Sequence, residues 1–197
     1  MNLNTLKKFA QQMRRELISS ISARLDYVLT HDDEYLRAHA AEKAAIVDKI
    51  AHNGKDALIE QAAYLWFNRL TAFRYMDARG FTSPRIVSAR PGETQPELLS
   101  EIKAGRVPSE LSALAARFDS LLDGKIKVAQ PEREVYKEAL LATCNAWAKE
   151  MPWLFSSVED WAGLLLPQDL LSPDSLVAKM VQGLSEEDCA QGVEIIG

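Results

Sequence analysis

Apolar residues recur at helical spacing through most of this chain. In the first segment they lie three or four positions apart, at Leu3, Leu6, Ala10, Met13, Leu17, Ile21, Leu25 and Val28. This spacing predicts a long amphipathic helix over about 4–30. The polar run 31–33 interrupts the pattern, and a second, alanine-rich helix is predicted to about Ala51. The run 52–54 ends in glycine and predicts a helix stop.

The segment 55–79 has a wider apolar arc than a surface helix needs. About half of its circumference is apolar, through Leu58, Ile59, Ala62, Ala63, Leu65, Trp66, Phe67, Leu70, Phe73 and Met76. We therefore expect a central helix packed on more than one side and ended by Gly80. Arg69 falls inside the arc and Asp77 beside Trp66. Because a buried charge is costly unless paired, we expect a structural ion network, in which the guanidinium of Arg69 meets a carboxylate or several carbonyl oxygens. The expected charge partner is Asp77 or an acid of another helix.

The second half of the chain is also predicted to be helical. The stretch 81–96 is irregular, because Pro84, Pro91, Gly92 and Pro96 interrupt it; only 86–88 favours an extended backbone. The predicted helices cover 97–104, 109–122, 131–150, about 158–166, a segment from Pro173 capped by Ser172, and one from Glu186 capped by Ser185. No stretch alternates with a period of two. The fold class is therefore all-α, a single-domain bundle of about seven to nine helices over 1–197, with 81–96 as the candidate internal boundary.

Composition narrows the class of protein. The 197 residues are 47% apolar and 26% charged, as in soluble globular domains. Cys144 and Cys189 form no disulfide framework, which is typical of a reducing compartment. The longest apolar run, 161–166, is far too short to span a bilayer. We expect a cytoplasmic protein without a membrane partner.

Charge divides the chain into two unequal halves. Residues 1–90 contain 14 Lys+Arg and 10 Asp+Glu, a local charge of +4, whereas residues 91–197 contain 9 and 18, a local charge of −9. On the first helix, Lys8 and Arg15 lie opposite the apolar face, flanked by Lys7 and Arg14. These four residues are the candidate contacts to duplex DNA, with an ordinary solvated helix face as the alternative. The acidic half favours contact with other proteins.

No catalytic or metal-binding pattern emerges from the remaining polar residues. The loose group His31, Asp32, Asp33, Glu34 and His39 falls at a predicted turn, where such residues serve as caps. No histidine pair has the spacing of a zinc motif. Cys144 is expected to be a small buried residue. We assign no catalytic, cofactor-binding or metal-binding residues to this chain.

One run of the central helix resembles a known family. It reads Ala63-Tyr64-x-Trp66-Phe67-Asn68-Arg69-x-x-Ala72-x-Arg74-Tyr75-Met76-Asp77-x-x-Gly80. This run, the opening LKKFAQQMRREL and the later PWLF…DWAGLLLPQDLLSPDSLV resemble the N-terminal part of the PglX family. Those proteins are adenine-specific DNA methyltransferases of BREX phage-defence systems. The resemblance implies a parent enzyme that transfers a methyl group from S-adenosylmethionine to adenine N6.

The catalytic motifs of such an enzyme are absent from this sequence. No two glycines stand two residues apart, and there is no Pro-Pro dipeptide. A glycine-rich cofactor turn and an Asn/Asp-Pro-Pro-aromatic adenine loop are therefore missing. The chain is predicted to be inactive alone and to act as a scaffold, a DNA-positioning element or a docking surface within a larger methyltransferase. The alternative is a stand-alone helical interaction module, or a remnant, with no nucleic-acid role.

The last residues of the sequence are apolar at Val193, Ile195 and Ile196. We expect such an ending in an excised domain, and a natural truncation would look the same.

Overall fold

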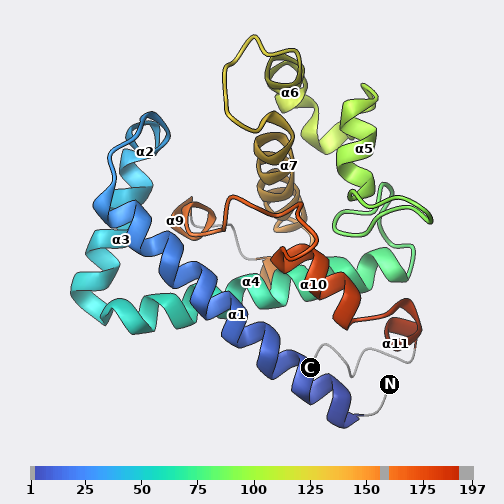
Figure 1. Cartoon of the computed structure of the whole chain (residues 1–197), viewed down its shortest axis with the longest axis horizontal. Coiled ribbons are helices and arrows are strands. Elements are labelled where there is room, and N and C mark those ends of the chain that lie inside the picture. The colour runs from blue at the N-terminus through green and yellow to red at the C-terminus, as the bar shows by residue number, and fades with distance from the viewer. Residues whose placement is uncertain (1–2, 156–159, 191–197) are drawn as a thin grey trace.

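The computed structural model describes residues 3–155 and 160–190, and within these ranges every regular element is helical (Figure 1). The elements are α1 (Leu3–Thr30), α2 (Glu34–Ala38), α3 (Ala40–Asn53), α4 (Lys55–Ala78), α5 (Glu97–Lys103), the 3₁₀ helix η1 (Ser109–Leu114), α6 (Ala115–Leu122), α7 (Pro131–Trp147), α8 (Pro152–Phe155), α9 (Asp160–Leu164), α10 (Leu176–Gly183) and α11 (Glu186–Ala190). The predicted all-α class is confirmed. The apolar ending at 193–196 lies outside the described residues.

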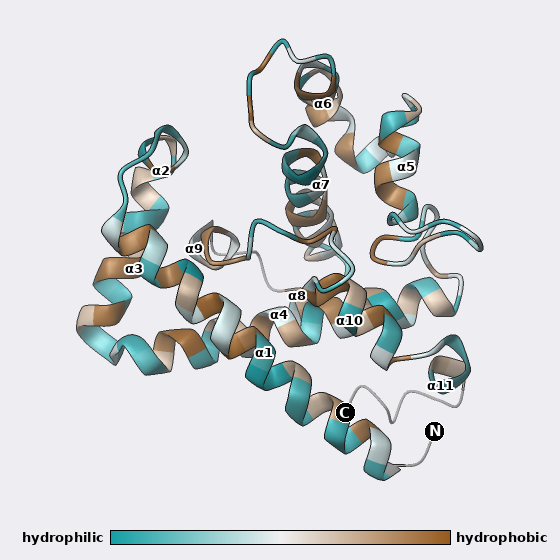
Figure 2. Cartoon of the chain, in the orientation of Figure 1, coloured by the Kyte–Doolittle hydropathy of each residue, from teal (hydrophilic) through white to brown (hydrophobic). Residues whose placement is uncertain are grey.

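The helix α4 is the centre of the fold. It packs against α1, α3, α8, α10 and α11, and fourteen of its residues are buried. In Figure 1, α1 crosses in front of α4, while α5, α6 and α7 form a group above it. Along α1, hydrophilic and hydrophobic positions alternate in bands (Figure 2), and its stripe Met13, Leu17, Ile21, Leu25 and Val28 is 0–1% exposed.

The structure contains more helical segments than the seven to nine predicted, for local reasons. The predicted second helix is broken at His39, whose φ of −113° and ψ of 37° lie outside the helical region, so that α2 and α3 are separate. The first half of the predicted helix 109–122 is a 3₁₀ helix. A short helix, α8, starts at Pro152, where only a stop was predicted. Pro152 can begin a helix because the first position needs no amide donor.

The structure contradicts one predicted helix boundary and confirms two others. The predicted cap Ser172 is wrong, because α10 begins three residues later, where the Ser175 side chain accepts a hydrogen bond from Ala178 N at 3.2 Å. By contrast, Ser185 caps α11 as predicted, accepting from Asp188 N at 3.1 Å. The stop at Gly80 is also confirmed, since its φ is +70° and Phe81 N donates to Met76 O at 2.8 Å.

Candidate functional site

The apolar centre of α4 forms the core of the molecule, as its wide arc predicts. Trp66, Leu70 and Phe73 are each 0% exposed. The indole Nε1 of Trp66 donates to Ala162 O on α9 at 2.9 Å, and the ring of Phe73 packs 4.7 Å from that of Phe155 on α8. The prediction that this helix touches several others is confirmed.

Asp77, at the last turn of α4, holds the irregular segment that follows the helix. Its carboxylate is 1% exposed and accepts four hydrogen bonds. The Thr82 hydroxyl donates to Oδ1 at 2.6 Å, and the three backbone amides of 86–88 donate at 2.8, 2.9 and 2.8 Å. The run 86–88 is therefore held by a side chain, not by a partner strand. The isolated bridge Ala89–Pro96 is the β pairing that the described residues contain.

Arg74 and Tyr136 complete this attachment from two sides. Arg74 Nε donates to Leu184 O at 2.7 Å and Nη1 donates to Ser88 Oγ at 2.9 Å. The Tyr136 hydroxyl, on α7, donates to Ile86 O at 3.0 Å. The arginine and aspartate of the Arg74-Tyr75-Met76-Asp77 run thus fix the loop 81–88 and the turn between α10 and α11 to one end of α4.

Arg69 is also buried, but it is not the partner of Asp77. It is 1% exposed, lies two turns earlier on the same helix, and places its guanidinium carbon 5.1 Å from the centre of the Trp66 ring. Burial lowers the pKa of Arg69. Asp77 is therefore not the charge partner of Arg69, because the donors that satisfy its carboxylate come from the following loop. A helical wheel contains no information on that loop. An acid of another helix, the other expected partner of Arg69, stays a prediction.

The four basic candidates on α1 do not have equal environments. Lys7, Lys8 and Arg15 are exposed, and no ion pair joins them to any described carboxylate. Arg14 forms an ion pair with Glu60 of α4. Three of the four predicted DNA contacts are therefore available on the surface, and the fourth already has a protein partner.

The polar residues at the turn after α1 are held by local contacts. Asp33 caps α2 by accepting from Leu36 N at 2.7 Å and from the Tyr27 hydroxyl at 2.8 Å. The rings of His31 and His39 stack on Tyr27 and Tyr35, at 4.0 and 4.3 Å between centroids. Among the described residues, no group of three His, Cys, Asp or Glu side chains is placed to hold a metal ion.

The two cysteines are buried and unpaired thiols. Burial raises the pKa of Cys144 to about 12 and also raises the pKa of Cys189. A thiol with a raised pKa is a poor nucleophile, because the thiolate is the reactive form. Neither cysteine is a candidate for catalysis.

A second buried polar cluster was missed by the sequence analysis. Arg24 of α1 and Lys137 of α7 are 7% and 2% exposed, although both are strongly basic. The guanidinium carbon of Arg24 lies 6.0 Å and Lys137 Nζ lies 5.3 Å from the centre of the Tyr35 ring on α2. Burial and the neighbouring Arg24 lower the pKa of Lys137 to about 8.

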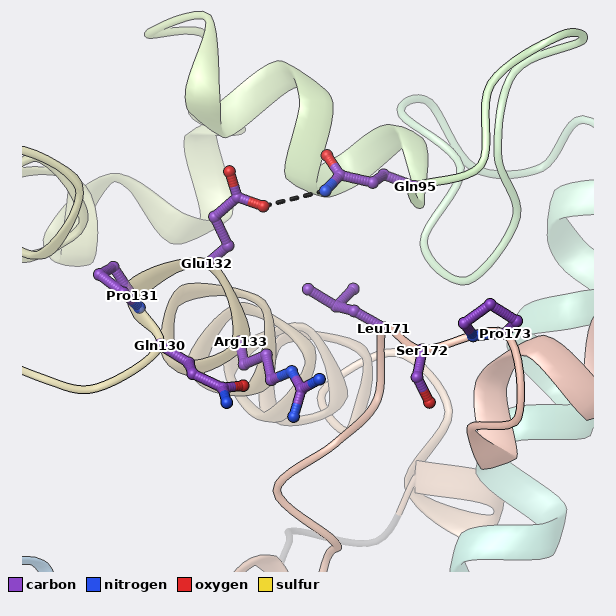
Figure 3. Close-up of a pocket in the computed structure, with 8 residues that line it drawn as sticks. All are labelled: Gln95, Gln130, Pro131, Glu132, Arg133, Leu171, Ser172 and Pro173. Atoms are coloured by element: carbon purple, nitrogen blue, oxygen red, sulfur yellow. Dashed lines mark hydrogen bonds between the residues drawn. The ribbon is translucent and has the colours of Figure 1, made fainter.

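A pocket of about 440 Å³ lies between the start of α7 and the loop before α10 (Figure 3). Gln95 Nε2 donates to Glu132 at 2.9 Å on one wall, and Arg133 pairs with Asp169 at 3.2 Å. The lining residues are Gln95, Gln130, Pro131, Glu132, Arg133, Leu171, Ser172 and Pro173. The two charged lining residues are thus already paired with residues outside the pocket, Glu132 with Lys103 and Arg133 with Asp169.

No helix within 3–155 or 160–190 combines the length and the apolar character needed to cross a bilayer.

The sequence of the chain is similar to those of two adenine-specific methyltransferases. It is 32% identical over 222 residues to the adenine-specific methyltransferase BrxX of Escherichia coli O9:H4 (strain HS), covering 100% of this chain and 18% of that protein. It is 26% identical over 234 residues to the adenine-specific methyltransferase PglX of Lacticaseibacillus casei (strain Zhang), covering 100% of this chain and 19% of that protein. No family model matches the chain.

The chain spans about a fifth of the length of these relatives. From end to end, its sequence matches the BrxX and PglX adenine-specific methyltransferases, consistent with an N-terminal region of that family.

Proposed function

We propose that this chain is the helical, non-catalytic part of an adenine-specific DNA methyltransferase of a BREX phage-defence system. The observation that carries the proposal is the end-to-end match to relatives five times as long. Methyl transfer to adenine requires a cofactor turn and a loop for the flipped base. Neither motif occurs in this sequence. S-adenosylmethionine and the catalytic residues then belong to the remainder of the longer protein.

Within that protein, the proposed role of this domain is to position duplex DNA through α1. Lys7, Lys8 and Arg15 form an exposed basic group near the start of that helix, and the stripe on its opposite face fixes the helix to α4. Lysine and arginine side chains neutralise phosphates without reading sequence. The domain would therefore add affinity and orientation, while base recognition lies elsewhere.

Docking of another protein is the second candidate role, and one residue favours it. Trp153 of α8 is 80% exposed, in the half of the chain with a local charge of −9. Exposed tryptophans are enriched where proteins meet, whereas acidic surfaces repel the DNA backbone. This role would fit a partner from the same defence system.

Two titrations test the proposal on the isolated chain. Calorimetry against S-adenosylmethionine should show no binding. A duplex titration should show weak binding that is indifferent to sequence. With three phosphate contacts, affinity should fall by about 40-fold as salt rises from about 0.05 to 0.2 M. Micromolar cofactor affinity, or salt-insensitive binding to one sequence, would contradict the proposal.

A charge-reversal variant and its matched control test whether DNA binds to α1. The double variant Lys8→Glu and Arg15→Glu should lose at least about tenfold in affinity at low salt, because two contacts become repulsive. The matched control is Lys127→Glu with Lys149→Glu, which changes net charge equally at two exposed residues outside α1. Equal loss in both variants would indicate a general charge effect and refute a site on α1. If duplex DNA does not bind the wild-type chain at all, the docking role is favoured.

A further inference from the structure

The cluster of Arg24, Lys137 and Tyr35 places two buried cations against one aromatic ring. Four elements build it: Arg24 comes from α1, Tyr35 from α2, Lys137 from α7, and the carbonyl of Leu164 from α9. In Figure 1, α9 lies between α3 and α7, with α2 above it. These segments are far apart in sequence, so the two cations are brought together only by the complete fold.

Neither cation has a carboxylate partner among the described residues. Arg24 Nε donates to Leu164 O at 3.2 Å, while its buried Nη2 has no hydrogen-bond partner within 3–155 or 160–190. No described hydrogen bond or ion pair involves Lys137 Nζ; its contact is with the ring of Tyr35. Two buried positive groups therefore lie against one aromatic ring, close enough that Arg24 lowers the pKa of Lys137.

The nearby carboxylates are engaged or distant. Glu138 is bound by Arg117, whose Nε donates at 2.7 and 2.9 Å. Asp33 caps α2 and accepts from Tyr27. Glu134 attracts both cations electrostatically but forms no ion pair with either.

Stacking on tyrosine rings does not balance the cost of this arrangement. A buried ion loses much more by desolvation than a cation–π contact returns, and two like charges add repulsion. An oxyanion between the two side chains would remove the repulsion and satisfy Arg24 Nη2. The planar guanidinium fork matches carboxylate and phosphate oxygens, and the lysine ammonium adds a point charge.

We infer that Arg24 and Lys137 form a binding site for one compact oxyanion, a phosphate or a carboxylate group, with Tyr35 as its apolar wall. The phosphates of an intact duplex are too constrained to reach a lysine that is 2% exposed. The ligand is therefore a small anion or a single acidic side chain. The site is independent of the proposed DNA contact on α1, so either can fail alone.

Thermal unfolding in inorganic phosphate tests the site directly. The melting temperature is compared in potassium phosphate and in potassium chloride at equal ionic strength, near pH 7. We expect phosphate to raise the wild-type midpoint by about 3 °C once its concentration is several times the dissociation constant. Lys137→Met should show less than a third of that rise. The control Lys127→Met, at an exposed lysine, should respond like the wild type.

Further variants keep the result interpretable. Lys137→Arg retains the charge and should keep the phosphate response, and Arg24→Met should lose it even if Lys137→Met folds poorly. Repeating the scan in potassium acetate separates the two chemistries: a larger shift in acetate indicates a carboxylate ligand, and a larger shift in phosphate indicates a phosphate. Equal stabilisation of all variants, or no shift in the wild type with either anion, would overturn the site.

Discussion

Asp77 and the Arg24–Lys137 pair are both buried, but the polar groups that surround the two kinds of charge differ. Asp77 receives four hydrogen bonds from the segment that follows it within eleven residues. Arg24 and Lys137 come from helices more than one hundred residues apart and meet no carboxylate among the described residues. A buried charge that a loop surrounds is structural, because its donors are local and complete. A buried charge that the fold leaves partly unsatisfied is a candidate for binding.

Removing the Asp77 carboxylate should have the largest effect on the free energy of unfolding. Asp77→Ala would leave the Thr82 hydroxyl and three amides buried without an acceptor, so the free energy of unfolding should fall by about 3–5 kcal/mol. Urea unfolding measures the change. As the control, Asp56→Ala removes an exposed carboxylate from the first turn of the same helix and should cost less than about 1 kcal/mol. If the two variants lose equal stability, Asp77 is not structural.

Removing Lys137 should have the opposite sign. Lys137→Met keeps most of the side-chain volume and removes a buried charge, so the free energy of unfolding should rise by about 1–3 kcal/mol near pH 7. The same urea experiment applies, in chloride without added oxyanion. Lys127→Met is the exposed control and should stay within about 0.5 kcal/mol of the wild type. A clear loss of stability in Lys137→Met would show that the ammonium is already well satisfied within the fold.

The pH dependence of this stabilisation should identify the titrating group. Lys137 has a folded pKa of about 8, below its ordinary 10.5. Between these values the unfolded chain binds more protons, so the wild-type free energy of unfolding should rise with pH. The groups around the ammonium are Arg24, Glu134, Glu138 and Tyr35, and Tyr35 has a pKa raised to about 12, which acts in the opposite direction above pH 10.

The measurement therefore belongs between about pH 7 and pH 9.5. There the advantage of Lys137→Met over the wild type should shrink by about 1–2 kcal/mol as the wild-type ammonium loses its proton. If the difference in free energy of unfolding between Lys137→Met and the wild type stays constant over this range, it arises from packing and not from the charge of Lys137.

Much of the fold followed from the sequence, because periodicity reports burial directly. The arc of α4 predicted the buried Trp66, Leu70 and Phe73, and the glycine at 80 predicted the end of the helix. What the arc could not give was the partner of Asp77. The amides of 86–88 belong to an irregular loop whose path depends on tertiary contacts with Arg74 and Tyr136.

The buried cations, in contrast, left a signal that periodicity could have revealed. Arg24 is three residues after Ile21 and four before Val28, so it lies on the apolar stripe of α1. Lys137 is followed at three and four positions by Leu140 and Leu141. The basic residues that were predicted to contact DNA are those on the exposed face of α1. Cations inside an apolar stripe are rarer and therefore more informative.

The smallest expected effect tests whether the donors to Asp77 act together. Thr82→Val removes one hydroxyl donor and leaves the three amides in place, so the free energy of unfolding should fall by about 1 kcal/mol. Thr94→Val, at an exposed threonine in the same irregular stretch, is the matched control and should change it little. If Thr82→Val costs as much as Asp77→Ala, the loop is held as one cooperative unit, because losing any single donor then releases the others. If Thr82→Val leaves the free energy of unfolding unchanged, the three backbone amides alone satisfy the Asp77 carboxylate.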